Sequence, residues 1–484
     1  MEVNLKKKET IFIILGVILV LTSIINNKFN YDKNNSILRN DNISNIKGLT
    51  SSVEIGKIHI DNNWTDVKAA ELCTGDGTYS NPYVIEDLII DVEGWGNGIL
   101  IENSNAFFTI ENVTIYNSGT YKGAIFLFNA SNGKLINNNL SSNSDGIISW
   151  FSDNNTFIGN MIYNNSEIGM NLNDCDNNTI SENFIYECGQ GIILIGEGNK
   201  ILENNVNDVN VGMDLMSMNS GIVSGNILNN NYIGITLYSC INSNITGNTI
   251  YENMDGIRLE RSEDINISGN ILNRNFGDGI RLYLSYNCDI KGNTISYSYY
   301  GIRLEQSEHN FISRNILYYN RPIGIFLESG SRYNDIIENN IIENDHCIYV
   351  DTTKYNTIYF NNFKDNQQKA SSLTSTNHWN SIKKVVYIYK GINFTNYLGN
   401  YWDDYLGTDG NNDGIGDFPY IINKERDYYP LMEPIENYTI IKIAESKRRE
   451  IASYNLLLLI SFLSIAAIIM SNTVKNNMKK KSLG

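Results

Sequence analysis

The residues of this 484-residue chain best suited to chemistry are oxygen-bearing side chains crowded into one short loop. They stand at loop positions 1, 3, 5 and 9, a glycine stands at position 6, and position 7 offers its backbone carbonyl. This spacing matches the first nine residues of an EF-hand-type calcium loop. The candidate ligands are Asp409, Asn411, Asp413, Ile415 (through its carbonyl) and Asp417.

Position 12 of that loop is Tyr420 rather than the bidentate glutamate of an EF-hand. A further ligand would have to come from elsewhere, for example from Asp403, Asp404 or Asp427. The other interpretation is an acidic turn that binds nothing. Crowded carboxylates repel one another without a cation, so we expect one structural Ca²⁺ that fixes the C-terminal part of the chain.

A second candidate is a row of arginines in a repeated phrase. Gly-Ile-Arg-Leu occurs three times, about 22 residues apart, and places Arg258, Arg281 and Arg303 at equivalent positions. Guanidinium groups stacked at the strand spacing of about 4.8 Å need anions nearby.

Two interpretations of the arginine row remain open. Glu260 and Glu305 emerge two residues later on the same face, and Glu328 follows one coil further, so the row could be a self-neutralised salt-bridge ladder. Tyr238 and Tyr283 lie on nearby rows, where they could stack on sugar rings of an acidic polysaccharide. We name all of these except Glu328 as candidate ligand-binding residues.

The sequence names no catalytic residue and no copper site. Its four histidines, His59, His309, His346 and His378, occupy unrelated positions, and no paired acid and base stands out at a coil face. The Met213, Met216 and Met218 group reads as core filler, so copper is not supported as a cofactor.

The elements that position these residues follow from the repeat. Each repeat of about 22 residues contains three short alternating apolar and polar phrases, bounded by Gly, Asn, Asp or Ser. Such a unit cannot bury its own apolar face and must stack on its neighbours. The sequence predicts an all-β right-handed parallel β-helix with three short strands per coil. The recurring Asn, from Asn138 to Asn339, is expected to form an inward ladder.

Hydrophobic segments flank the repeat. An apolar run over residues 10–25 follows three lysines and is a signal anchor or a signal peptide. The charge-free run at 451–470 is long enough to span a bilayer, and a basic tail follows it. We expect N- and C-terminal transmembrane helices, with the β-helix outside the cell.

The net charge of −16 argues against a nucleic-acid partner. The expected organisation is a signal anchor or signal peptide at 1–27, a flexible spacer at 28–52, an N-terminal cap at 53–95 and the β-helix at 96–364. An irregular loop or cover at 365–398 precedes the candidate calcium module at 399–433. A stalk at 434–450, a transmembrane helix at 451–471 and a basic cytoplasmic tail at 472–484 complete the chain.

The coils resemble the parallel β-helix repeats of the carbohydrate-binding and sugar-hydrolase superfamily. The module from Gly399 to Met432, with its Gly-Asn-Tyr-Trp, Asp-Gly-Ile-Gly-Asp and Tyr-Pro-Leu motifs, resembles the C-terminal signature of NosD-like surface proteins. The resemblance implies the fold more firmly than an activity.

We therefore expect a protein of the cell membrane with an extracellular β-helix, which binds glycans or other envelope polymers without catalysis. The alternative is a polysaccharide lyase, hydrolase or epimerase that acts on acidic glycans. A second alternative, implied by the NosD resemblance, is an accessory protein of copper-site maturation.

Overall fold

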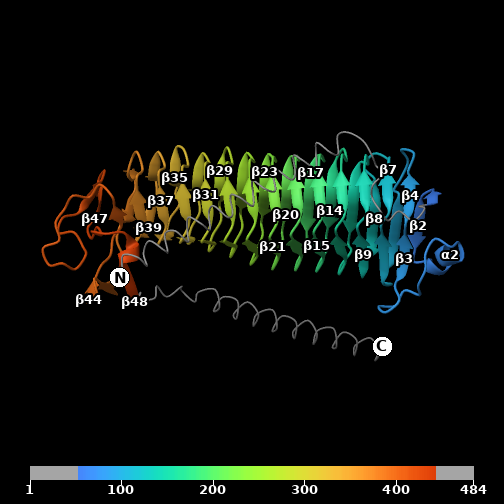
Figure 1. Cartoon of the computed structure of the whole chain (residues 1–484), viewed down its shortest axis with the longest axis horizontal. Helices are drawn as coiled ribbons and strands as arrows, with labels where there is room; N and C mark the ends of the chain where they lie inside the picture. The colour runs from blue at the N-terminus through green and yellow to red at the C-terminus, as the bar shows by residue number, and fades with distance from the viewer. Residues whose placement is uncertain (1–52, 443–484) are drawn as a thin grey trace, which may run out of the picture. The chain divides into compact units, whose positions relative to one another are not determined.

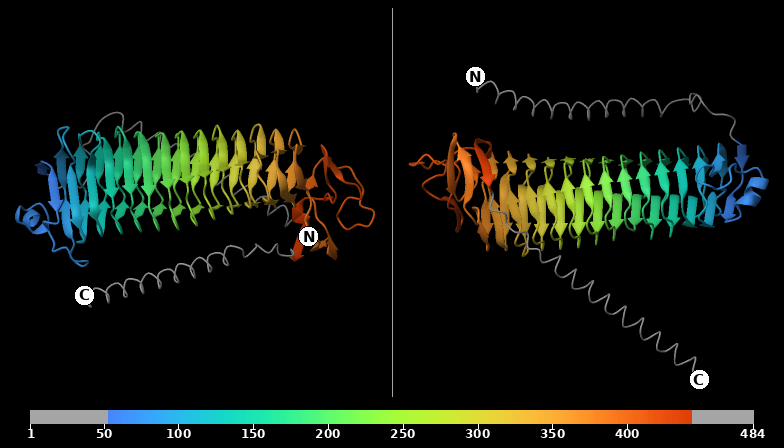
Figure 2. Two further views of the ribbon diagram at one scale, coloured as in Figure 1. Left: turned by 180° about the vertical axis from the view of Figure 1, so that it is seen from behind. Right: turned by 90° about the horizontal axis from the view of Figure 1, so that it is seen from below.

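The computed structural model describes residues 53–442, which form a parallel β-solenoid. Each coil contributes one strand to each of three parallel sheets, called A, B and C, in the order B, C, A along the chain. Figure 1 shows the strands of successive coils side by side, and the two views of Figure 2 show the same stack from behind and from below. The predicted fold class is confirmed for this part of the chain.

Sheet A has 15 strands. They are β1 (Val53–Ile55), β4 (Leu88–Asp91), β7 (Thr114–Tyr116), β10 (Asn139–Ser141), β13 (Met161–Tyr163), β16 (Phe184–Tyr186), β19 (Asn205–Asn207), β22 (Ile227–Asn229), β25 (Thr249–Tyr251), β28 (Ile271–Asn273), β31 (Thr294–Ser296), β34 (Ile316–Tyr318), β37 (Asn340–Ile342), β40 (Asn362–Lys364) and β45 (Tyr401–Trp402).

Sheet B has 14 strands, most of them six residues long. They are β2 (Ile58–Asp61), β5 (Ile99–Ser104), β8 (Gly123–Ala130), β11 (Asp145–Trp150), β14 (Ile168–Asn173), β17 (Gln190–Ile195), β20 (Val211–Met216), β23 (Ile233–Tyr238), β26 (Asp255–Glu260), β29 (Asp278–Tyr283), β32 (Tyr300–Glu305), β35 (Ile323–Glu328), β38 (His346–Asp351) and β41 (Ser371–Leu373).

Sheet C also has 14 strands. They are β3 (Tyr83–Glu86), β6 (Phe108–Glu111), β9 (Gly133–Ile136), β12 (Thr156–Ile158), β15 (Thr179–Ser181), β18 (Lys200–Leu202), β21 (Ile222–Ser224), β24 (Asn244–Thr246), β27 (Asn266–Ser268), β30 (Asp289–Lys291), β33 (Phe311–Ser313), β36 (Asp335–Ile337), β39 (Lys354–Tyr359) and β42 (Thr376–His378).

Alternation assigns the two faces of each strand, as predicted. Ile257 and Ile280 pair in register in sheet B and are fully buried. At the turns the predicted asparagine ladder is present, and each Nδ2 donates to the Oδ1 one coil on, at 2.9–3.0 Å from Asn138 to Asn361. The ladder satisfies amide groups that would otherwise be costly to bury.

The first coil begins earlier than the expected cap at 53–95 suggests. β1 to β4 already pair into the three sheets. A 21-residue insertion between β2 and β3 hides the repeat in the sequence, and within it the helix α2 (Trp64–Ala69) packs Trp64 on Tyr83, with ring centroids 4.7 Å apart. Figure 1 shows α2 at the blue end of the stack.

The solenoid also continues beyond the expected boundary at residue 364. β41 and β42 extend sheets B and C through the segment expected to be irregular, and β45 completes sheet A. The remaining strands, at the red end in Figure 1, are β43 (Val385–Tyr389), β44 (Ile392–Asn396) and β48 (Tyr438–Lys442) in one antiparallel sheet, and β46 (Tyr420–Ile422) with β47 (Glu425–Asp427) in a hairpin. A short 3-10 helix, η2 (Ile435–Asn437), precedes β48.

The two expected transmembrane helices, within 1–27 and at 451–471, lie outside the described residues. Among residues 53–442, none of the helices is long and apolar enough to cross a membrane.

Candidate functional site

The three arginines lie in register on the outward face of sheet B, as the repeat predicts. Arg258 pairs with Arg281, and Arg281 with Arg303, in successive strands β26, β29 and β32. Two predicted partners are in place. Arg281 Nη2 lies 2.8 Å from Glu305 Oε2, and Arg303 Nε donates to Glu328 Oε1 at 2.6 Å. The arrangement is a neutralised ladder at this end of the row.

Two carboxylates that sequence reasoning missed complete the ladder. Arg258 forms an ion pair with Asp255, and Asp278 Oδ2 lies 3.7 Å from Arg303 Nη1 and 3.9 Å from Arg281 Nε. Asp255 and Asp278 are both 5% exposed, and the backbone N–H of Asp278 donates to Asp255 Oδ1 at 2.7 Å.

The pKa of Asp278 is raised to about 6. Burial is the main cause and the nearby Asp255 charge adds to it, while the three guanidinium groups oppose it. A single sequence signal pointed to this pair. Aspartate immediately precedes the glycine in two of the three Gly-Ile-Arg-Leu phrases.

The other predicted ligand-binding residues are only loosely joined to this row. Glu260 lies 3.5 Å from Arg261 rather than beside the row, and Arg261 also donates to the Tyr238 hydroxyl at 2.8 Å. Glu260 and Tyr283 occupy equivalent positions on β26 and β29, one row further along the face. Both border the row, and among the described residues Glu260 forms its ion pair with Arg261 rather than with the three arginines of the row.

Aromatic side chains continue the arginine row towards the C-terminal end. Arg303 is followed in register by Phe326 and Tyr349, and its guanidinium lies 5.4 Å from the ring centre of Tyr300 and 5.8 Å from that of Phe326. The ring centres of Tyr300 and Phe326 are 5.1 Å apart, and those of Phe326 and Tyr349 are 5.6 Å apart. The face therefore joins ion pairs to a contiguous aromatic cluster.

The loop over residues 409–417 is folded around its own acidic side chains. Asp409 Oδ2 accepts from Gly414 N at 2.9 Å, Asn411 Oδ1 accepts from Asp413 N at 3.1 Å, and Asp413 Oδ1 accepts from Ile415 N at 2.9 Å. Asp417 Oδ2 accepts from Thr408 Oγ1 at 2.9 Å. The side-chain oxygens organise the loop, and hard oxygens of this kind are the donors that Ca²⁺ prefers.

The three residues considered as additional calcium ligands bond to other groups of the protein. Asp403 forms an ion pair with Lys369, and Asp404 accepts from the Tyr420 hydroxyl at 3.2 Å. Asp427 is fully buried and accepts from Asn400 N at 2.7 Å. Within residues 53–442, no three His, Cys, Asp or Glu side chains are grouped to hold a metal ion.

Asp427 explains the Gly-Asn-Tyr-Trp motif that opens the module. Asn400 Oδ1 accepts from Asn361 Nδ2 at 2.9 Å and so extends the asparagine ladder, while Trp402 Nε1 donates to Asp427 Oδ2 at 3.0 Å. A Cβ on Gly399 would lie 1.9 Å from Asp427 Oδ1, so only glycine fits there. The module therefore ends the sheet A stack as a C-terminal cap.

The residues that copper would require are separated. Met213 and Met218 are fully buried, whereas Met216 stands on the outward face of β20 beside Ile195 and Tyr238. The six cysteines are free and buried, and burial raises the pKa of the Cys240 thiol to about 11. The described residues do not fit a copper site.

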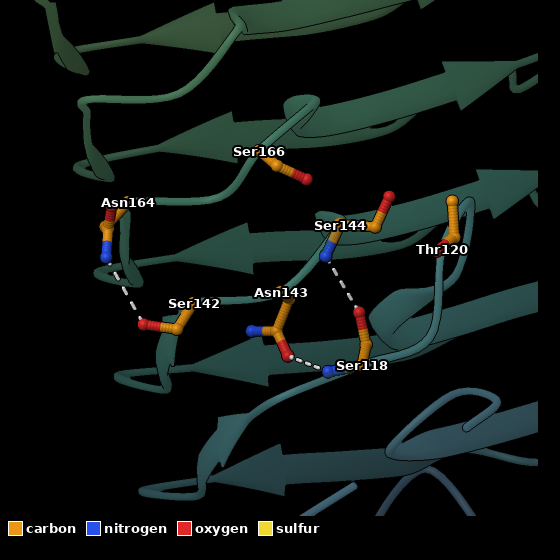
Figure 3. A pocket seen from close by; sticks show the side chains of 7 residues that line it. All are labelled: Ser118, Thr120, Ser142, Asn143, Ser144, Asn164 and Ser166. Atoms are coloured by element: carbon orange, nitrogen blue, oxygen red, sulfur yellow. Dashed lines mark hydrogen bonds between the residues drawn. The ribbon is translucent and has the colours of Figure 1, made fainter. Parts of the chain in front are cut away.

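A pocket of about 300 Å³ lies at the turn between sheets A and B, near the N-terminal end. Figure 3 shows its hydroxyl and amide side chains bonded across neighbouring coils; Asn143 Oδ1 accepts from Ser118 N at 3.0 Å, and Ser118 Oγ accepts from Ser144 N at 2.9 Å. These side chains accept hydrogen bonds from the backbone of neighbouring coils. The lining residues are Ser118, Thr120, Ser142, Asn143, Ser144, Asn164 and Ser166.

Two family models match the chain. The model described as "Periplasmic copper-binding protein (NosD)" matches residues 195–354 and 323–407, and the model described as "Right handed beta helix region" matches residues 72–220. A comparison with curated protein sequences gave no significant match.

Solved structures with a similar fold include sugar-active enzymes. The A-module of the mannuronan C-5 epimerase AlgE6 from Azotobacter vinelandii is 14% identical, with a TM-score of 0.42, over 61% of this chain and 87% of that one. DFA-IIIase from Arthrobacter chlorophenolicus A6 is 15% identical, with a TM-score of 0.45, over 60% of this chain and 92% of that one. The family matches and the solenoid together show that the chain is a right-handed parallel β-helix protein, and that it resembles the NosD family over the residues matched by that model.

Proposed function

We propose that this protein is a membrane-anchored β-helix of the cell surface that binds glycans or other envelope polymers without catalysis. The observation that carries the proposal is the outward face of sheet B from β23 to β35. There, charged groups able to bond hydroxyls border aromatic rings able to pack on sugars. Pairing of each arginine with a carboxylate favours a binding surface over a reactive centre, because every charge already has a partner.

Membrane attachment rests on the apolar runs at 10–25 and 451–470, and the extracellular placement on the basic tail that follows the second run. We also propose one structural Ca²⁺ in the loop of Asp409, Asn411, Asp413, Ile415 and Asp417. Its role would be to stiffen the C-terminal cap, since the loop lies against β43 through the Tyr387 hydroxyl, which donates to the Asp413 carbonyl at 2.8 Å.

Binding is tested with the full chain in detergent micelles on an immobilised glycan panel. We expect saturable binding to at least one glycan class, reduced by substitutions on the outward face of β26 to β35. Absence of saturable binding to any glycan on the panel would contradict the proposed function.

A second candidate is an enzyme acting on acidic glycans, and one observation favours it. Asp255 and Asp278 bring two buried carboxylates together on adjacent coils beside three arginines, the kind of group that acid–base catalysis uses. Incubation of the protein with polyuronates tests this candidate. New reducing ends, an unsaturated product or a changed epimer ratio, each lost in Asp278→Asn, would favour it over simple binding.

Copper delivery, which the NosD description suggests, is not proposed for this chain. Met213 and Met218 are buried in the solenoid while Met216 faces outward, and the cysteines are buried thiols.

A further inference from the structure

Four consecutive coils leave an apolar side chain exposed at the same corner, where the chain enters sheet B. The exposed fractions are 55% for Tyr232, 44% for Met254, 68% for Phe276 and 50% for Tyr299. Backbone hydrogen bonds link these corners, since Asp255 N donates to Tyr232 O and Tyr299 N donates to Gly277 O. Exposed apolar groups are ordinary when single, but an aligned set of four marks an interaction surface. We call these four residues the corner ridge.

The corner ridge borders the arginine face. One or two residues after each ridge side chain, the chain enters β23, β26, β29 or β32. The ring centres of Tyr299 and Tyr300 are 4.8 Å apart, so the ridge is continuous with the aromatic cluster of Tyr300, Phe326 and Tyr349. The result is a strip of apolar side chains that runs along the coils beside the ion pairs of the arginine face.

The charge of the arginine face argues against a polyanion as its ligand. The outward positions of β26, β29, β32 and β35 carry five carboxylates and only three guanidinium groups. An acidic polymer would have to displace Glu305 and Glu328 from Arg281 and Arg303, and it would approach a protein of net charge −16. The five carboxylates are those of Asp255, Glu260, Asp278, Glu305 and Glu328.

The partly exposed charged groups of the same face favour a ligand rich in hydroxyl groups. The side chains of Arg258, Arg281 and Arg303 keep 33%, 27% and 23% of their surface exposed, and those of Glu305 and Glu328 keep 22% and 20%. A ligand can therefore reach these groups without breaking their ion pairs. A hydroxyl both donates and accepts, so it can serve a guanidinium and a carboxylate alike.

We propose that this face binds an uncharged, linear glycan that runs parallel to the solenoid axis. Its rings pack on the corner ridge and its hydroxyls bond the Arg–carboxylate pairs. The coil spacing of about 4.8 Å is comparable to the length of one pyranose unit, so successive coils meet successive sugars. This inference rests on the proposed glycan-binding function, and it differs from the acidic polysaccharide that the sequence analysis considered for the arginine row.

Calorimetry of the full chain in detergent, with neutral β-linked hexose oligosaccharides and with polyuronates of the same length, tests the proposal. We expect the neutral series to bind more tightly, with little dependence on salt. Phe276→Ala should weaken that binding about three- to tenfold, because one aromatic packing contact is lost. The matched control is Tyr355→Ala, which removes a half-exposed ring stacked on Tyr333 at another corner.

The outcomes separate the inference from the function on which it rests. Tighter binding of polyuronates would overturn the neutral ligand while leaving glycan binding intact. Neutral binding that is weakened by Tyr355→Ala and not by Phe276→Ala would place the site elsewhere. Failure of both series to bind would overturn the inference, and the proposed function would fall only if the glycan panel also showed no saturable binding. Thermal unfolding of both variants at the wild-type temperature shows that each is folded.

Discussion

Arg258, Arg281 and Arg303 meet carboxylates of two kinds, and only one kind follows from strand alternation. Glu305 and Glu328 follow from it, because positions two residues apart share a face. Asp255 does not, because alternation is interrupted at the glycine. A Cβ on Gly256 would lie 2.7 Å from Leu272 inside the solenoid, so Gly256 and Ile257 both face inward and Asp255 faces out. The aspartate before the glycine is visible in the sequence, but only the structure shows that it faces the arginines.

Asp278 makes the stability of the protein depend on pH in a defined direction. Its pKa is raised to about 6 in the folded state, so protonation favours the folded protein. The stabilising contribution is complete below the pKa of the unfolded chain, about 4, and is lost as the pH rises through 6. We expect the unfolding free energy of the wild type, relative to Asp278→Asn, to fall by about 1–3 kcal/mol between pH 4 and pH 7.

Chemical denaturation of both proteins across that pH range measures this difference. The groups shared by the two proteins, including the Asp145 carboxyl with its pKa of about 6, cancel in the comparison. If the stability of the wild type relative to Asp278→Asn rises with pH or stays constant, the pKa of Asp278 is not raised in the folded protein.

The calcium proposal is also decided by single side chains. Added Ca²⁺ should raise the unfolding temperature, because the folded loop binds it and the unfolded chain does not. Asp413→Asn should abolish that rise, since it removes one charge while keeping an oxygen that can accept from Ile415 N. Asp153→Asn is the control, because the Asp153 carboxylate also accepts a hydrogen bond from a backbone N–H, that of Asp176, and lies far from the loop. If isothermal calorimetry detects no heat of binding at millimolar Ca²⁺, the calcium proposal is contradicted.

At the level of the strand, the inward and outward assignments are open to a matched test. Ile290 and Lys291 are neighbours on β30, and the first is fully buried while the second is exposed. Ile290→Asp should cost several kcal/mol, since it buries a charge without a partner. Lys291→Asp should change stability by only about 0.5 kcal/mol. Similar losses for the two variants in denaturant unfolding would mean that the faces are assigned wrongly.

The regular elements could be predicted from the sequence, while the ends of the solenoid could not. The repeat of glycine and asparagine specifies coils wherever its spacing is kept, and the asparagine ladder confirms that interpretation. Insertions between β2 and β3 and between β42 and β45 break the spacing. The strands that flank these insertions are held in the solenoid by pairing with neighbouring coils, and sequence periodicity does not reveal that pairing.

For the whole molecule, the proposed anchoring gives a topology that can be measured. Protease added to intact cells should cleave the β-helix, while a tag after Lys481 stays protected because the basic tail is placed in the cytoplasm. Separate immunoblots against the tag and against the β-helix report whether each part of the chain has been cleaved. Loss of the tag signal in intact cells would contradict the proposed C-terminal anchor.

The central claim is that a glycan binds to the outward face of sheet B from β23 to β35, together with the corner ridge. Hydroxyl-radical footprinting of the full chain with and without a bound neutral oligosaccharide tests it most directly, because aromatic side chains report their own exposure. The account predicts protection of Tyr232, Phe276 and Tyr299, with unchanged labelling of Trp95, which is 78% exposed far from the face. Protection confined to Trp150 and Phe151, or to the rings at Tyr333 and Tyr355, would contradict it.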